Sequence, residues 1–220
     1  SNYNTTNSIE IALNATDLLS PISYVYSNIT FSNSSSQVLI LSTAGGDKYN
    51  ASFSVPNLLG RYNITFFVND SAGNINESEA TYFNVYDNIY PTAQFISPTP
   101  LNGSLQAINT TRINISITDN IATGDCILEF DGINVTMTKI GSGTNTLCNY
   151  TKTQISVGWH NFTVYFNDSS GNTNRTETRT YQIDVSIPFV EFVFPTETSG
   201  TYLTRSNILI NATASAEVSI

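Results

Sequence analysis

Apolar and polar residues alternate with a period of two along several short segments of this chain. The clearest segment is Arg112–Thr118, in which every second residue is an isoleucine. The same phase recurs in Ile9–Ala15 and in Ile208–Ala214. Alternation of this kind predicts strands with one buried and one exposed face, so the three segments predict one strand that occurs three times.

A longer segment of the chain occurs twice. Residues 60–76 read GRYNITFFVNDSAGNIN, and residues 158–174, which lie 98 positions further on, read GWHNFTVYFNDSSGNTN. Each copy predicts a strand followed by a polar turn, at 69–74 and at 167–172, and we interpret these as hairpin turns rather than ligand sites. A period near 100 residues is too long for a solenoid repeat and matches one small all-β domain of the immunoglobulin type.

Further strands and boundaries follow from the same reasoning. Ala80–Tyr86 and Thr178–Val185 predict the strand after each repeated segment, and Tyr90-Pro91 and Ile187-Pro188 mark extended links between units. No segment shows the sustained three-and-four spacing of a helix longer than one turn. The middle unit also predicts strands near 92–97, 111–118, 126–130, 133–139 and 146–152, with Asp131-Gly132 as a hairpin turn.

We therefore expect an all-β protein built of tandem immunoglobulin-like antiparallel β-sandwiches. The first domain spans residues 1–88 and shows no obvious first strand. The second domain spans residues 89–186, and residues 187–220 are the first strands of a third, incomplete unit.

Composition excludes some classes of partner. Charged residues make up 11% of the 220 residues, and the net charge is -9 with only 8 Lys and Arg. A nucleic-acid partner would require clustered basic residues, so we expect none. No stretch approaches the roughly 18 to 20 apolar residues that span a bilayer, so we expect no membrane span in this chain.

The two cysteines, Cys126 and Cys148, lie 22 residues apart within one unit. In a polar chain an even number of cysteines predicts a disulfide and an oxidising compartment, while two reduced thiols in the core are the alternative. Cys126 is expected on the strand at 126–130 and Cys148 on the strand at 146–152. The bridge would then differ from that of antibody domains, which joins the second and sixth strands.

Two of these segments resemble a known family. Asn69-Asp-Ser-Ala-Gly-Asn74 after an aromatic strand, and Asp125-Cys-Ile-Leu-Glu-Phe-Asp-Gly132 ahead of Cys148, resemble the immunoglobulin-like repeats of archaeal cell-surface and S-layer-associated proteins. The resemblance covers two units and the start of a third, and it implies a stalk, a lattice component or an adhesin-like array at the cell surface. The first unit departs from the pattern because it lacks cysteines.

Asn-X-Ser/Thr sequons are unusually frequent. With 27 Asn, and Ser or Thr at 55 of 220 positions, random order would give about seven sequons, and the chain has 17. Asn and Thr two residues apart on the outer face of a strand create some sequons automatically, but this does not account for those in loops. We predict N-linked glycans at several of them. The sequons begin at Asn4, Asn14, Asn28, Asn33, Asn50, Asn63, Asn69, Asn76, Asn102, Asn109, Asn114, Asn134, Asn149, Asn161, Asn167, Asn174 and Asn211.

Enzymatic chemistry finds little support in the sequence. His160, the single histidine, takes the position of Tyr62 in the other copy, and we expect it at the surface or rim of its strand. Neither a Gly-X-Ser-X-Gly motif nor a phosphate-binding glycine loop occurs. We therefore predict that the chain is not an enzyme.

A calcium site is the more serious chemical hypothesis. In a series of immunoglobulin-type sandwiches, the last strand of one domain meets loops of the next, which would bring Asp87 near Asp119 and Asp168. Three carboxylates in one place suit calcium, which prefers oxygen ligands. Turn capping is the competing role for Asp119 and Asp168, and no dense Asp-X-Asp-X-Asp motif occurs.

Phe189–Phe194 is rich in aromatic and branched residues, and such a strand would aggregate if it stayed unpaired. Either the chain is a segment of a longer repetitive protein, or this strand is donated head to tail to the first unit of another copy, which would build a fibre.

The sequence thus favours a structural component of an extracellular surface filament, stalk or lattice, with other copies of itself and N-linked glycans as partners. The alternative is an adhesin that recognises a glycan or another cell. Exposed aromatic residues would favour adhesion, and we expect the candidates Tyr24, Tyr26 and Trp159 in the core or at its rim.

Overall fold

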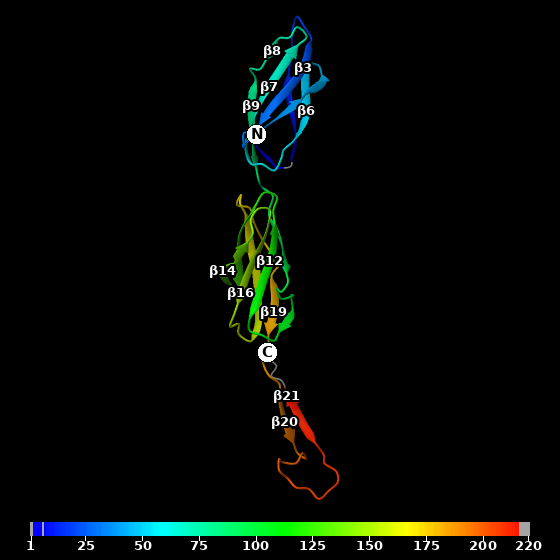
Figure 1. The fold of residues 1–220 in the computed structure, drawn as a ribbon, viewed down its shortest axis with the longest axis vertical. Helices are drawn as coiled ribbons and strands as arrows, with labels where there is room; N and C mark the ends of the chain where they lie inside the picture. Colours follow the sequence, from blue (N-terminus) through cyan, green and yellow to red (C-terminus); the bar gives the residue numbers. More distant parts are fainter. Residues whose placement is uncertain (1, 6, 216–220) are drawn as a thin grey trace. The chain divides into compact units, whose positions relative to one another are not determined.

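The expected all-β architecture is confirmed. A computed structural model describes residues 2–5 and 7–215, and in these residues it contains strands, turns and bends but no α-helix. The ends of the expected first and third domains, residues 1 and 216–220, lie outside the described residues, as does Thr6 of the Asn4 sequon. Figure 1 shows the strands as arrows, with colours that follow the sequence.

Contacts between residues divide the chain into two compact units. The first consists of Ser1–Pro91 with two loops, Asp119–Thr123 and Asp168–Asn172. The second consists of Thr92–Thr118, Gly124–Asn167 and Thr173–Ile220. The three-part division expected from the sequence stays a prediction.

The first unit has a sheet in the order β1-β9-β7-β3-β4, with β8 paired to β7, and a second sheet in the order β2-β6-β5. Figure 1 shows β3, β7 and β9 side by side. The strands are β1 (Asn2–Asn4), β2 (Ser8–Asn14), β3 (Ile22–Thr30), β4 (Ser36–Ile40), β5 (Ser42–Gly45), β6 (Lys48–Ser54), β7 (Gly60–Asp70), β8 (Ile75–Asn76) and β9 (Ala80–Tyr86).

The second unit repeats this arrangement with a sheet in the order β11-β19-β17-β13-β14, with β18 paired to β17, and a sheet in the order β10-β12-β16-β15. The hairpin of β20 and β21 belongs to the same unit. The strands are β10 (Thr92–Ile96), β11 (Ser104–Gln106), β12 (Thr111–Thr118), β13 (Thr123–Phe130), β14 (Ile133–Thr136), β15 (Thr138–Ile140), β16 (Asn145–Lys152), β17 (Gly158–Asp168), β18 (Thr173–Arg175), β19 (Arg179–Ile183), β20 (Phe189–Val193) and β21 (Asn211–Ser215).

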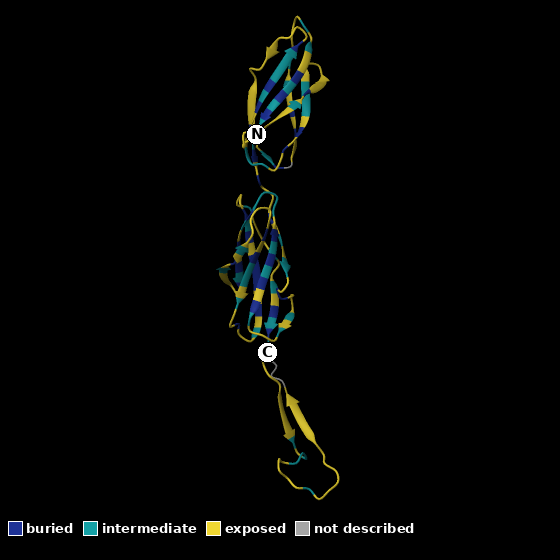
Figure 2. Ribbon diagram, in the orientation of Figure 1, coloured by how far each residue is buried: buried dark blue, intermediate teal, exposed yellow. Residues whose placement is uncertain are grey.

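Each unit encloses one hydrophobic core between its two sheets, which makes it an immunoglobulin-like sandwich. The alternation read from the sequence sets the buried face, because Ile113, Ile115 and Ile117 on β12 are all fully buried. Figure 2 shows the resulting stripes of buried and exposed positions along the strands. The predicted Asp131-Gly132 turn is also confirmed, since Phe130 pairs with Ile133 and both turn residues have positive φ.

Three sequence expectations need correction. The first unit has a short strand ahead of β2, because β1 pairs in parallel with β9 as β11 does with β19. Three residues are too few to show a period, so the sequence pattern did not reveal it. The strand expected at 133–139 is two strands, β14 and β15, which join different sheets. Alternation along residues 158–168 predicts Thr163 on the outer face together with Asn161, but Thr163 is buried, and its hydroxyl is hydrogen-bonded to that of Thr178 at 2.7 Å.

The hairpin of β20 and β21 repeats the pairing of β10 with β12. Thr99 Oγ1 donates to the backbone carbonyl oxygen of Asn114 and accepts from the backbone N–H of the same residue. Thr196 makes the same two hydrogen bonds with the backbone of Asn211. The strand expected at 208–214 begins only at Asn211. Residues 111–113 of β12 pair with β16, whereas the described chain offers β21 no partner besides β20.

Candidate functional site

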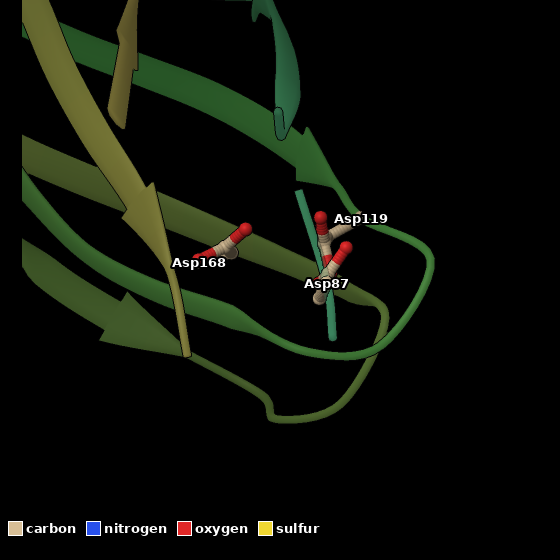
Figure 3. Close-up of side chains that lie close together, drawn as sticks. All are labelled: Asp87, Asp119 and Asp168. Atoms are coloured by element: carbon tan, nitrogen blue, oxygen red, sulfur yellow. The ribbon is translucent and has the colours of Figure 1, made fainter. Parts of the chain in front are cut away.

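Asp87, Asp119 and Asp168 come together as the sequence hypothesis expected. One carboxylate oxygen from each lies within 4.8 Å of the other two. All three residues belong to the first compact unit, Asp87 after β9 and the other two in its added loops. Figure 3 shows their carboxyl groups gathered in one place.

Local turns position two of the three carboxylates. Asp119 Oδ2 accepts hydrogen bonds from the backbone N–H groups of Ile121 and Ala122, at 2.8 and 2.9 Å. Asp168 Oδ1 accepts from the backbone N–H groups of Ser170 and Asn172, both at 2.8 Å. The capping role weighed for these residues in the sequence therefore exists, and it coexists with the convergence of the carboxylates.

Asp87 is held by the loop that contains Asp168. Ser170 Oγ donates to Asp87 Oδ2 at 3.3 Å, and Asn172 Nδ2 donates to the Asp87 carbonyl oxygen at 3.2 Å. The Asp87 Oδ1 atom accepts from the backbone N–H of Ile89 at 3.0 Å. The third carboxylate is thus fixed by bonds to main chain and neutral side chains.

The electrostatics of the cluster are unbalanced. Asp87 and Asp168 are buried, and Asp119 Oδ1 is a buried oxygen without a hydrogen-bond partner in the described chain. None of the ion pairs among residues 2–5 and 7–215 includes any of the three aspartates. Three converging carboxylates repel one another, and burial strengthens this repulsion because water screens it less. The arrangement therefore suits a cation.

The spacing fits calcium in particular. Calcium binds oxygen ligands at about 2.3 to 2.6 Å, so two oxygens on one ion lie at most about 5.2 Å apart. The observed limit of 4.8 Å falls inside that span. Asp87, Asp119 and Asp168 would each supply a carboxylate oxygen, and Asp119 Oδ1 is not committed to another bond.

The matching turn in the first repeated segment has a simpler environment. Asp70 accepts from the Asn74 side chain at 2.7 Å and from its backbone N–H at 2.8 Å, as Asp168 does from Asn172. These bonds, with one from the Ser20 hydroxyl, lower the pKa of Asp70 to about 2. The shared bonds identify the repeated Asn-Asp-Ser-X-Gly-Asn sequence as a turn clamp.

The two cysteines form a disulfide that joins the two sheets of the second unit. Cys126 lies on β13 and Cys148 on β16, with 6.5 Å between their Cα atoms. Both are buried in the core. The expected bridge and its strands are therefore present in the structure.

The expectation that His160 lies at the surface is wrong. Its side chain is buried, Nε2 lies 2.9 Å from the Ser156 carbonyl oxygen, and Nδ1 lies 2.7 Å from Asp131 Oδ2. A carbonyl oxygen and a carboxylate both only accept hydrogen bonds, so the imidazolium form satisfies both contacts. The ring ties the strand β17 to the turn at Asp131, which is a structural role.

Two of the three aromatic residues expected in the core or at its rim are more exposed than predicted. Trp159 is 62% exposed and Tyr24 is 42% exposed, while Tyr26 is half-buried. Tyr26 stacks on Phe67 of the neighbouring strand with ring centroids 4.7 Å apart. These rings stand on the outer faces of their sheets, because the alternate residues of the same strands fill the core.

None of the 17 sequon asparagines is buried. Seven are half-buried, namely Asn4, Asn28, Asn50, Asn69, Asn114, Asn149 and Asn167. The other ten are exposed, namely Asn14, Asn33, Asn63, Asn76, Asn102, Asn109, Asn134, Asn161, Asn174 and Asn211.

Comparison with known proteins gives likeness in structure only. No protein-family model matches the chain, and no curated protein matches it. The fibronectin(III)-like modules of Clostridium thermocellum CbhA are 19% identical with a TM-score of 0.33, over 84% of this chain and 88% of theirs. A tetra-tandem repeat from the extending region of a large adhesion protein is 15% identical with a TM-score of 0.41, over 96% of this chain and 60% of that one. The ICAM-5 D1-D4 ectodomain fragment is 11% identical with a TM-score of 0.45, over 89% and 54%. Likeness at this level carries nothing about activity.

Among the described residues, no helix is long and apolar enough to cross a bilayer.

Proposed function

We propose that this chain is a structural segment of an extracellular surface assembly, namely a filament, stalk or lattice built from glycosylated immunoglobulin-like repeats. The observation that carries this proposal is repetition of structural detail. The Asp–Asn turn clamp occurs in both repeated segments, and the Thr–Asn bonds of β10 and β12 recur in β20 and β21. What the repeats share is therefore the means of holding a sandwich together.

The chemistry of the chain supports an oxidising, extracellular setting. A buried disulfide joins two sheets of one unit, and none of the 17 sequon asparagines is buried. The single histidine serves as a structural donor. These features favour a structural module over an enzyme.

Electron microscopy of intact cells with gold-labelled antibodies against this chain tests the proposal. We expect label on the outer surface in a regular array, and a fall in the apparent mass of the native chain when its N-glycans are released. Label confined to the cell interior would overturn the extracellular assignment. Label on the surface without any regular spacing would favour the adhesin.

The adhesin is the second candidate, and the exposed rings of Tyr24, Tyr82 and Trp159 favour it. Saturable binding of the purified chain to one class of immobilised glycan would support it. That binding should then be lost when Tyr24, Tyr82 and Trp159 are replaced by alanine one at a time. Phe83 stays unchanged in every variant, because it is buried in the core. Absence of binding across a broad glycan panel would remove this candidate.

A calcium site at Asp87, Asp119 and Asp168 is proposed as part of the structural role. Asp119→Asn is the sharpest variant, because the amide oxygen keeps the turn bonds to Ile121 and Ala122 while one negative charge is lost. Asp17→Asn is the matched control, since Asp17 accepts the same two kinds of backbone bond from Leu19 and Ser20.

Calorimetric titration with calcium chloride should show one site on the chain. Asp119→Asn should weaken the affinity at least about tenfold, whereas Asp17→Asn should leave it unchanged. Loss of binding in both variants, or heat of binding that neither changes, would rule out this site. Added calcium should also raise the melting temperature of the first unit.

A further inference from the structure

Aromatic residues and sequons are arranged together on the outer faces of the two larger sheets. Five sequon asparagines lie on β3, β7 and β17, and four of them follow an aromatic residue by two positions. The four pairs are Tyr26 with Asn28, Phe67 with Asn69, Trp159 with Asn161 and Tyr165 with Asn167.

This association exceeds what composition gives. Aromatic residues make up 11% of the chain, so five positions would hold about half an aromatic residue by chance. The nine sequon asparagines on the other strands have no aromatic residue two positions before them. These nine are Asn4, Asn14, Asn50, Asn76, Asn114, Asn134, Asn149, Asn174 and Asn211.

Strand geometry places the two members of each pair side by side. Residues i and i+2 of a strand point to the same face and lie about 7 Å apart. A sugar linked to the asparagine therefore reaches the ring that precedes it. The C–H face of a pyranose is apolar, and the face of an aromatic ring carries the negative end of its quadrupole, so the two stack favourably.

Trp159 shows the clearest mismatch between a side chain and its surroundings. Trp159 is 62% exposed near the start of β17, where it pairs with Gln182 of β19, and the exposed Asn161 follows it by two residues. Leaving so much of a tryptophan in water gives up most of the free energy that its burial would contribute. Something that covers the ring from the solvent side would recover it.

The same position in the first unit is arranged differently. Arg61 replaces Trp159, its Nε donates to Asn63 Oδ1 at 2.9 Å, and its guanidinium carbon lies 3.8 Å from the centre of the Tyr82 ring. The side chains beside Asn63 thus already satisfy one another within the protein. Asn161 has an open ring beside it instead.

We propose that Trp159 is the stacking platform for the first sugar of an N-linked glycan on Asn161, and that Asn167 uses the exposed ring of Tyr165 in the same way. The proposal rests on the proposed function, because it requires a glycosylated extracellular chain. It assigns Trp159 and Tyr165 to the protein's own glycans rather than to an external partner.

The chain offers a direct probe, because Trp159 is its only tryptophan. Intrinsic tryptophan fluorescence therefore reports on this ring alone. The full chain would be secreted from an N-glycosylating eukaryotic host, the occupancy of each sequon measured by mass spectrometry of glycopeptides, and the fluorescence quenched with acrylamide before and after enzymatic release of the glycans.

We expect Asn161 to be occupied and the glycan to shield one face of the indole, so the quenching constant should be about twofold lower than after glycan release. Asn161→Gln should raise the quenching constant to the deglycosylated value. Asn63→Gln, the matched control at the twin position, should leave it unchanged.

Each contrary result has a separate meaning. An occupied Asn161 with the same quenching constant before and after release would overturn the stacking and leave the proposed function intact. An empty Asn161 among occupied sequons would overturn this platform as well. A chain without glycans on any sequon, when isolated from its natural source, would overturn the proposed glycosylated module itself.

Discussion

Tyr62 in the first unit and His160 in the second occupy the same place on β7 and β17, 98 residues apart in the sequence. The Tyr62 hydroxyl donates to the carbonyl oxygen of Leu58 at 2.8 Å, and His160 Nε2 lies 2.9 Å from that of Ser156, in both cases four residues back. Burial raises the pKa of the Tyr62 phenol, so the hydroxyl stays a donor at neutral pH. The position thus requires a ring that donates one hydrogen bond, and two different side chains meet the requirement.

The cores of the two units differ in a related way. The backbone N–H of Met137 donates to the carbonyl oxygen of Cys126, and that of Leu41 donates to the carbonyl oxygen of Val25, so Val25 holds the place of Cys126. Cys148 pairs with Ile115 as Ala51 pairs with Ile11. Apolar volume in one unit therefore replaces a covalent bridge in the other, and the fold itself does not depend on the bridge.

Removing the bridge should give the largest effect. In the chain-entropy model, closing a loop of 22 residues stabilises the folded state by about 3 kcal/mol. Replacing Cys126 and Cys148 together by alanine should cost about that much, plus the lost sulfur packing, and only in the second unit. Hydrogen exchange measured in both units checks this. Equal loss of protection in the first unit would show that the two units do not unfold independently.

Replacing Tyr62 or His160 should give the next largest effect, and its size should differ between the two units. His160→Phe removes both hydrogen bonds and leaves the acceptors at Ser156 and Asp131 unpaired, so we expect a loss of about 2 to 3 kcal/mol. Tyr62→Phe removes one bond and should cost about 1 to 1.5 kcal/mol. Denaturant unfolding of the two variants gives both values. A smaller loss for His160→Phe than for Tyr62→Phe would contradict the structural role assigned to the Asp131 contact, and His160→Tyr, which restores one donor, should fall between.

Much of this fold could be predicted from the sequence because local rules determine it. The strict alternation of apolar and polar residues predicted the bounds of β12 correctly. The Asp131-Gly132 pair predicted the turn between β13 and β14, because two-residue hairpin turns require positive φ and favour these two residue types. The carboxylate cluster could be predicted because loop positions follow from the topology of a sandwich. The burial of His160 could not, because a histidine in the place of a tyrosine looks polar until its two acceptors are located. Exposure of Trp159 was missed for the opposite reason, since a large apolar ring is expected inside.

A buried hydroxyl in the first unit offers a smaller, stabilising test of the comparison. Ser27 lies two residues after Val25, and Leu128 lies two residues after Cys126, so Ser27 and Leu128 hold equivalent positions. The side chains of Ser27 and Leu128 are both fully buried. The Ser27 hydroxyl has no hydrogen-bond partner in the described chain. Ser27→Val should therefore stabilise the first unit by about 1 kcal/mol, because an unsatisfied polar group is removed from the core. Leu128→Ser should destabilise the second unit, and a stabilising result there would contradict the equivalence of the two positions. Thermal unfolding measures both.

Acid should lower the stability of the first unit through Asp70, and this is the smallest of the expected effects. The Asn74 side chain, the Asn74 backbone N–H and the Ser20 hydroxyl all donate to this carboxylate and lower its pKa from 3.8 to about 2. A carboxyl group whose pKa is lower in the folded state stabilises the fold above its unfolded pKa, and that contribution is lost as the pH falls through the folded value. The first unit should therefore lose stability between about pH 4 and pH 2. Asn74→Ala keeps the carboxylate but removes its side-chain donor, so the loss should begin at higher pH. NMR titration of the Asp70 carboxyl carbon follows both proteins directly, and titration near 3.8 in the unmodified chain would show that the clamp does not bind the charged form in preference to the neutral one.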